Sequence, residues 1–192
     1  MKRIGFIGEG DSEVVLFTSI SFKDLLFEYN LESVGEINAE GRGKFERFST
    51  QLESKVKILL ERKPEKIFII SDLENEACIS HYKSIIIKYS NIQIEVIAVK
   101  TIEAWLLADS ETLAVLLKGR FHFDFPEKTQ ELPLYILQKN FMDRIGKGLG
   151  NSKPKIMKKF IKNGFGVDRA AKHTNCPSAK YFLKKLKEFS EE

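Results

Sequence analysis

Carboxylate side chains gather at two points of the chain where apolar runs end. Residues 4–7 lead into the turn GEGDSE at residues 8–13, and residues 67–70 lead into Asp72 and Glu74. Glycine turns that begin helices often bind phosphate, because helix N-termini attract anions. Here the turn itself carries three acids, so a phosphate would be repelled unless a divalent cation lay between. The pattern therefore indicates a metal site at these turns.

The spacing of the acids supports the same chemistry. Asp72 and Glu74 are two residues apart and would project to one side of an extended chain. Glu9 and Glu13 are four apart and would share one side of a helix that begins early. Clustered carboxylates repel each other unless a cation neutralises them, and hard oxygen ligands favour Mg²⁺ or Mn²⁺ over zinc. Any one of these acids taken alone is more simply explained as a helix cap or a solvated turn residue.

The elements that must position these acids alternate between strands and helices. Apolar runs predict strands at residues 2–8, 66–71 and 92–99, and a weak alternation of apolar and polar residues predicts one at residues 31–37. Helical spacing predicts helices at residues 12–29, 45–62, 76–89 and 101–109. Ser12 is a candidate N-cap for the first helix. This order predicts an α/β fold, a three-layer Rossmann-like sandwich with a mostly parallel sheet. Right-handed crossovers would place all strand ends on one rim, where open sheets hold their ligands.

The pattern changes after residue 118, which predicts a core over residues 1–118 and a basic helical extension over residues 119–192. Helices are expected at residues 132–145, 154–162, 167–173 and 178–189. Residues 144–187 hold 13 Lys or Arg and one acid, Asp168, a net charge of +12, whereas the whole chain carries +4. Such asymmetry is typical of an acidic metal centre beside a surface that binds polyanions, or of solvated lysine-rich helices.

Several other classes of protein fit the sequence less well. Cys78 and Cys176 form no CxxC pair, which argues against a zinc finger or a disulfide scaffold and favours a reducing compartment. The chain starts directly with a strand and has no apolar run of transmembrane length, so we expect a cytoplasmic protein without a membrane partner. Glu13 replaces the third glycine of a dinucleotide fingerprint, so no nucleotide cofactor is expected. A phospho-acceptor role for Asp72, as in receiver domains, stays open as an alternative.

The order of the acids resembles the Toprim domain of topoisomerases, bacterial primases and OLD-family nucleases. A strand ends in Glu9, a helix follows, and a later strand ends in the pair Asp72-Leu73-Glu74, with Glu74 in place of the usual second Asp. The stretch EGDSE at residues 9–13 is similar to the OLD-like branch, in which a second acid one turn later joins the site. The stretch IEAWLLAD at residues 102–109, and more loosely residues 153–155 and 175–178, are similar to a bacterial family of uncharacterised OLD-like Toprim proteins.

This resemblance implies metal-dependent phosphodiester chemistry. Glu9, Asp72 and Glu74 would be metal ligands, while Glu13 and Asp11 would bind a second metal or act through water. A metal set of Glu9, Glu13, Asp72, Glu74 and Glu103 is therefore expected, with Mg²⁺ or Mn²⁺ as the ion.

Two further residues complete the expected site. Glu103 follows the fourth strand and would reach the same rim, although an acid favoured by the dipole of its own helix explains it equally well. Lys153, or less specifically Lys155, would supply a cation beside the phosphate oxygens. The catalytic set predicted by the resemblance is thus Glu9, Asp72, Glu74 and Lys153.

The resulting functional expectation is a Mg²⁺-dependent nuclease that acts on DNA or RNA. The basic extension would bind the phosphate backbone without sequence preference, and binding would weaken steeply with salt. The resemblance alone implies a place in bacterial phage defence with a partner ATPase. The alternative is a non-catalytic regulator with a Toprim-like fold that binds nucleic acid or a protein partner.

Overall fold

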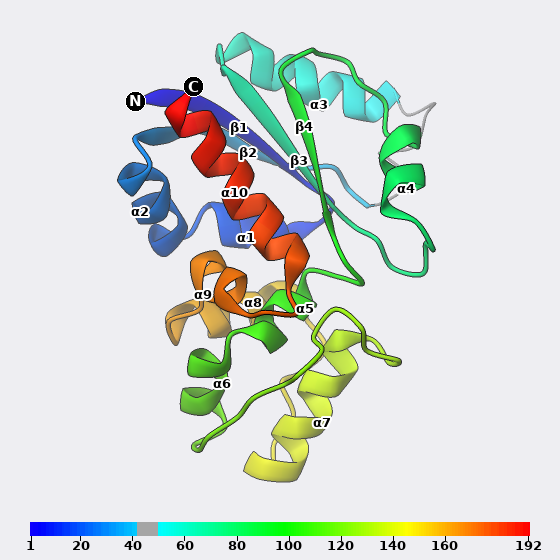
Figure 1. The fold of residues 1–192 in the computed structure, drawn as a ribbon, viewed down its shortest axis with the longest axis vertical. Coiled ribbons are helices and arrows are strands. Elements are labelled where there is room, and N and C mark those ends of the chain that lie inside the picture. Colours follow the sequence, from blue (N-terminus) through cyan, green and yellow to red (C-terminus); the bar gives the residue numbers. More distant parts are fainter. Residues whose placement is uncertain (42–49) are drawn as a thin grey trace.

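The computed structural model describes residues 1–41 and 50–192 (Figure 1). Within them, four parallel strands form one sheet in the order β2-β1-β3-β4. The strands are β1 (Lys2–Gly8), β2 (Leu31–Asn38), β3 (Lys66–Asp72) and β4 (Gln93–Ala98). β3 is central and buried on both faces, as its unbroken apolar run predicted. The expected parallel α/β sheet is therefore confirmed.

Helices cover both faces of this sheet and form a lobe beyond its C-terminal edge (Figure 1). They are α1 (Asp11–Phe17), α2 (Ile20–Glu28), α3 (Thr50–Glu61), α4 (Ile79–Ile85), α5 (Glu103–Ala108), α6 (Ser110–Leu116), α7 (Pro133–Ile145), α8 (Lys153–Lys162), α9 (Val167–Lys172) and α10 (Pro177–Glu191). One hydrophobic cluster joins the sheet to α3 and α4, and a second joins the opposite face to α1, α2 and α10. The molecule is thus a Rossmann-like three-layer sandwich with α5 to α9 below it.

The structure corrects two details of the predicted first helix. The expected single helix over residues 12–29 is two helices, because the Ser19 hydroxyl accepts a hydrogen bond from the Phe22 N–H at 3.3 Å and caps α2. Ser12 is not the N-cap of α1; Gly10 holds that position. The Glu13 carboxylate turns back to accept the Gly10 N–H at 3.0 Å, which satisfies one of the free donors at the helix start.

Other helix boundaries also differ from the predicted ones. The helix expected over residues 76–89 is shorter, since the turn after β3 continues to Cys78 and α4 begins at Ile79. α6 was not predicted, although Asp109 accepts the Thr112 N–H at 3.0 Å and caps it. The glycines at residues 38–43 predict a loop, and part of it lies outside the described residues, as does the start of the helix predicted over residues 45–62.

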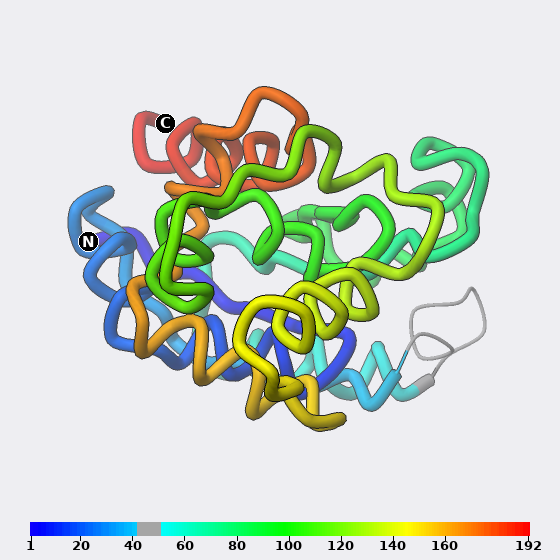
Figure 2. Tube along the Cα trace, turned by 90° about the horizontal axis from the view of Figure 1, so that it is seen from below, coloured from blue at the N-terminus to red at the C-terminus, as the bar shows by residue number. Residues whose placement is uncertain are grey.

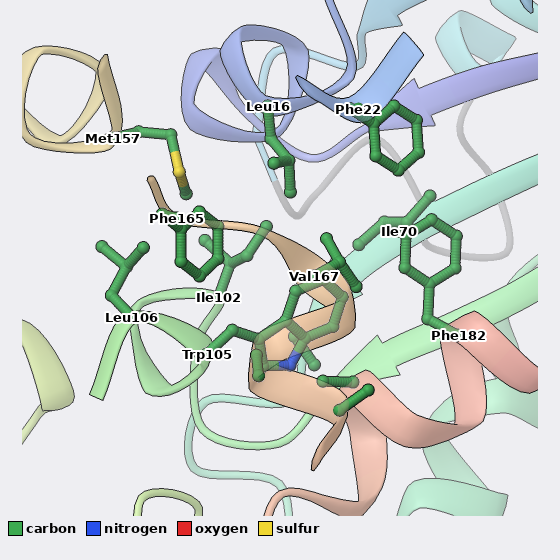
Figure 3. Close-up of a cluster of buried hydrophobic side chains, with 14 of the residues drawn as sticks. Leu16, Phe22, Ile70, Ile102, Trp105, Leu106, Met157, Phe165, Val167 and Phe182 are labelled. Carbon is green, nitrogen blue, oxygen red and sulfur yellow. The ribbon is translucent and has the colours of Figure 1, made fainter. Parts of the chain in front are cut away.

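The C-terminal extension shares its core with the sheet. Phe182 on α10 lies among the rings of Phe6, Phe68 and Trp105, with centroids 5.8 to 6.4 Å from its own. Figure 3 shows Phe182 and Trp105 in this hydrophobic cluster. Lys2 Nζ donates to the Phe189 carbonyl at 2.8 Å, so both chain ends lie on the same side of the molecule (Figure 2). Helix α10 is therefore one layer of the sandwich, while α7 to α9 belong to the lobe beyond the strand ends.

No helix in residues 1–41 and 50–192 combines the length and the apolar content needed to cross a bilayer.

The register of the strands determines which residues meet at the C-terminal edge of the sheet. Gly8 pairs with Ile70, and Asp72 pairs with Ala98, so β1, β3 and β4 end next to one another. The acids that follow these strands are consequently brought to one edge of the sheet.

Candidate functional site

A cavity of about 320 Å³ lies at the C-terminal edge of the sheet, where β1, α1, β3, α5 and α8 meet. Acids from three strand ends line it together with one lysine: Glu9, Glu13, Asp72, Glu103 and Lys153. Asp11 and Glu40 lie at its exposed rim. The alternation of strand and helix thus collects residues that are up to 144 positions apart in the chain (from Glu9 to Lys153).

Glu9 is anchored across the tip of β3. Its Oε2 accepts the Ser71 hydroxyl at 2.8 Å and the Asp72 N–H at 2.9 Å. The Ser71 hydroxyl also lies 2.7 Å from the Tyr82 hydroxyl of α4. These contacts hold the Glu9 carboxylate beside the backbone of β3, directly next to Asp72.

Asp72, the last residue of β3, is a buried acid in the wall of the cavity. It is 6% exposed, and its Oδ1 accepts the Ile102 N–H at 2.8 Å. Burial raises the pKa of its carboxyl well above the ordinary value, and the nearby carboxylates Glu13, Glu103 and Glu9 raise it further, against the charge of Lys153. Asp72 is therefore a buried acid surrounded by other acids.

Glu13 is pressed against the end of β1. It is 3% exposed, and burial, with smaller repulsion from Glu103 and Glu9, raises the pKa of its carboxyl to about 7. Backbone hydrogen bonds from Glu13 and Gly10 oppose this rise. A Cβ on Gly8 would collide with the Cβ of Glu13, so the close approach of the side chain requires glycine at this position.

Among the described residues that line the cavity, Glu103 and Lys153 form the one ion pair between two lining residues. Lys153 Nζ lies 3.2 Å from Oε1 of Glu103 and donates to Oε2 at 3.4 Å. Glu103 is 2% exposed, whereas the Lys153 side chain is 47% exposed and reaches solvent. Burial disfavours the ammonium, but Glu103 and then Asp72 outweigh it and raise the pKa of Lys153. One firmly charged cation therefore faces four carboxylates.

Glu74 lies outside this arrangement, although the sequence placed it in the site. β3 ends at Asp72, and Glu74 has a left-handed φ of 51° with its N–H donating to the Lys100 carbonyl at 2.6 Å. Its side chain is exposed and does not line the cavity. The expectation that Asp72 and Glu74 project to the same side is wrong, because the chain leaves the extended conformation between them.

The other predicted residues fall into two groups. The structure brings Glu9, Glu13, Asp72, Glu103 and Lys153 together. Lys155 is exposed on the outer face of α8 and does not line the cavity.

Sequence reasoning missed the contribution of the second strand. Asn38 ends β2 and lines the cavity, and its Nδ2 donates to Oδ1 of Asp11 at 2.6 Å. Glu40 follows it at the rim and pairs with Lys55 at 3.0 Å. The signal was present in the sequence, since the rule that gathers strand ends applies to β2 as it does to β1 and β3.

The carboxylates of the cavity are engaged by donors of the protein itself. Among the described residues, no three His, Cys, Asp or Glu side chains are arranged as a ready metal-binding group. Each acid is instead held by a protein donor: Glu9 by Ser71, Glu13 by Gly10, Asp72 by Ile102, and Glu103 by Lys153. The donor set still fits a hard divalent cation, because it consists of carboxylate oxygens whose mutual repulsion such an ion would relieve.

The order of the acids along the chain is the one that suggested a Toprim domain, with Glu9 after the first strand and Asp72 at the end of β3. That resemblance stays a prediction. Comparisons with protein-family models, with curated proteins and with solved structures find no match for this chain.

Proposed function

We propose that this protein is a divalent-metal-dependent nuclease of the Toprim type that hydrolyses phosphodiester bonds in DNA or RNA. The observation that carries the proposal is the convergence of Glu9, Glu13, Asp72 and Glu103 in one cavity with Lys153 as their only cation among the described lining residues. Buried like charges destabilise a fold unless a counter-ion neutralises them. Acids so placed are typical of sites where function, and not stability, selects the residues.

The residues divide the work of such a site between them. Glu9, Asp72, Glu103 and Glu13 would hold Mg²⁺ or Mn²⁺, as the oxygen chemistry of these ions requires. The bound ion would lower the pKa of an attacking water and offset the charge of the phosphate. Lys153, whose side chain is about half exposed, would bind a non-bridging phosphate oxygen. Ser71 and the Asp72 N–H orient Glu9 for this task.

The nucleic acid would be bound mainly outside the cavity, because the acids repel a polyanion. The basic C-terminal region supplies the opposite charge, with +12 over residues 144–187. A role in bacterial phage defence beside a partner ATPase belongs to the same proposal and is supported by the Toprim resemblance of the sequence.

A matched pair of Asp→Asn variants tests the proposal. Asp72→Asn neutralises a buried acid of the cavity, while Asp24→Asn neutralises an exposed acid on α2. Plasmid DNA, single-stranded DNA and RNA are incubated with each protein in Mn²⁺, in Mg²⁺ and in EDTA. We expect metal-dependent cleavage by the parent and by Asp24→Asn, and a loss of at least about 100-fold in Asp72→Asn. Equal cleavage by Asp72→Asn would overturn the assignment of the site.

One observation favours the second candidate, a non-catalytic regulator that binds nucleic acid or a partner. Lys153 already neutralises Glu103 at 3.2 Å, so part of the acidic charge is balanced without an ion. For a regulator of this kind, we expect Mn²⁺ to leave the melting temperature unchanged, no cleavage of any substrate, and undiminished binding of nucleic acid.

A further inference from the structure

The solvent face of α8, the helix whose first turn borders the cavity, is a stripe of lysines. At 3.6 residues per turn, four lysines fall within an arc of about 100° on one side of this helix. They are all exposed: Lys155, Lys158, Lys159 and Lys162. The opposite side is apolar and buried through Ile156, Met157 and Phe160. The stripe is therefore directed to solvent by the packing of the other face.

Lys153 places the first turn of α8 at the cavity. It lies four residues before Met157 and seven before Phe160, so it falls on the inner side of α8 and reaches Glu103. Figure 3 shows Met157 in the same apolar cluster as Leu16 of α1, the helix that carries Glu13. The first turn of α8 is thus a wall of the cavity, and the lysine stripe leads away from it.

Helix α10 holds a similar number of lysines in a different electrostatic setting. Residues 177–192 contain four lysines and three glutamates, a net charge of +1, whereas residues 151–166 contain five lysines and no acid, a net charge of +5. On α10, Glu188 lies 2.7 Å from Lys185 and 3.5 Å from Lys184. No ion pair between described residues involves Lys155, Lys158 or Lys162 of α8.

The depth of the acids constrains the form of the nucleic acid. Asp72 and Glu103 are 6% and 2% exposed, so a phosphate must enter the cavity to come near them. A duplex is stiff, with a persistence length of about 150 base pairs, and cannot bend one phosphate into such a recess. A flexible single strand or a frayed end can. Lys155 and Lys162 are separated by about 10 Å along the axis of α8, which is long enough to contact more than one phosphate of a strand.

We propose that α8 is the track along which the backbone of a single-stranded nucleic acid approaches the cavity. Lys155, Lys158 and Lys162 bind successive phosphates without reading bases, and Lys153 meets the strand at the entrance. Delivery of the strand to the acids rests on the proposed nuclease function, whereas binding along α8 does not.

Two matched triple variants test the track. The α8 variant combines Lys155→Gln, Lys158→Gln and Lys162→Gln; the α10 variant combines Lys180→Gln, Lys184→Gln and Lys187→Gln. Each removes three exposed positive charges at nearly equal helical spacing. Lys159 is kept in both, because its ammonium packs 4.9 Å above the Phe141 ring. Circular dichroism and thermal melting establish that both variants fold.

Binding is measured in EDTA, so that it does not depend on metal or on cleavage. The probes are a labelled 20-nucleotide oligo(dT) and a labelled 20-base-pair duplex, titrated between 50 and 200 mM salt. We expect the α8 variant to lose at least about tenfold in affinity for the single strand and to lower the salt slope by about two, at about 0.7 per phosphate contact. The α10 variant should lose less than about threefold. The parent should bind the single strand more tightly than the duplex.

Each contrary result identifies a different fault. Equal losses in the two triple variants would show that net charge alone drives binding and would overturn the track. Tighter binding of duplex than of single strand would overturn the single-stranded substrate. Binding only to vesicles of phosphatidylserine, with neither nucleic acid bound, would assign α8 to an anionic membrane surface instead. If the α8 variant loses binding but the parent never cleaves in Mn²⁺, the nuclease proposal fails while the track stands.

Discussion

Two buried carboxylates, Asp72 and Glu127, have similar burial and opposite surroundings. Glu127 is 4% exposed, and its Oε1 accepts the Ser178 hydroxyl, the Ser178 N–H at 3.1 Å and the Cys176 thiol at 3.2 Å. Burial raises the pKa of both carboxyl groups. Around Glu127 the hydrogen bonds then lower the pKa, whereas around Asp72 three further carboxylates raise it and Lys153 alone among the main influences lowers it.

The difference separates an acid with a structural role from one that fits the proposed metal site. Glu127 is surrounded by donors at the start of α10, where the helix dipole also favours a negative charge, so it fastens the loop before α7 to that helix. Asp72 accepts the Ile102 N–H and otherwise faces acids. A buried acid with few donors and several acidic neighbours is stabilised as an anion by an external cation. The comparison therefore predicts opposite responses to mutation.

The largest effect is expected at Glu127. Glu127→Ala removes the acceptor for Ser178 and Cys176 and leaves those buried donors unpaired, which should lower the free energy of unfolding by about 3 to 5 kcal/mol. Urea denaturation measures this loss. Glu131→Ala, an exposed acid of the same loop, should change stability by less than about 0.5 kcal/mol. If Glu127→Ala lowers the free energy of unfolding by less than about 1 kcal/mol, Glu127 does not have the structural role that distinguishes it from Asp72.

The second effect is a pH dependence that belongs to the cavity. The pKa of Glu13 is raised from 4.5 to about 7, so the folded state binds more protons than the unfolded state between these values. The free energy of unfolding should therefore fall as the pH rises from 4.5 to 7 in EDTA, by roughly 2 to 3 kcal/mol. Glu13→Gln should flatten this slope in urea titrations at successive pH values. A rise in stability over the same range in the parent would contradict the cluster of repelling acids.

A smaller effect of opposite sign to that of Glu127→Ala is expected at Asp72. Asp72→Asn keeps an oxygen for the Ile102 N–H and removes a repelled charge, so stability at pH 8 in EDTA should rise by about 1 to 2 kcal/mol. Saturating Mn²⁺ should stabilise the parent and leave the variant unchanged, as followed by thermal melting. Destabilisation of Asp72→Asn by more than about 1 kcal/mol would give Asp72 the structural role that Glu127 has.

The smallest effect is expected at Glu74, where the sequence and the structure disagree. Glu74→Gln changes an exposed side chain outside the cavity, so stability should stay within about 0.5 kcal/mol and Mn²⁺ affinity within about twofold. Calorimetric titration of Mn²⁺ into Glu74→Gln and Asp72→Asn compares the two directly. A loss of affinity in Glu74→Gln as large as that in Asp72→Asn would restore the sequence-based ligand pair.

Local patterns in the sequence determined the sheet and most of its rim. Apolar runs predicted β1, β3 and β4, and a weak alternation predicted β2. The rule for parallel strand ends placed Glu9, Asp72 and Glu103 at one edge. This part is predictable because each strand follows from a short local pattern, and because crossovers between parallel strands are right-handed almost regardless of sequence. The contrast between the basic stretch at residues 144–187 and the rest of the chain follows directly from counting charges in the sequence.

Tertiary packing decided the rest. Glu74 lies outside the cavity because its own φ of 51° turns the chain after β3. Lys153 lines the cavity because the buried side chains of Met157 and Phe160 fix the rotation of α8 against the core. The tether between Glu127 and Ser178 joins residues 51 positions apart, a distance over which no periodicity carries information. Sequence alone therefore determined which residue types reach the sheet edge. Which of them face the cavity depends on the contacts that fix each turn and helix, and those contacts form only in the folded chain.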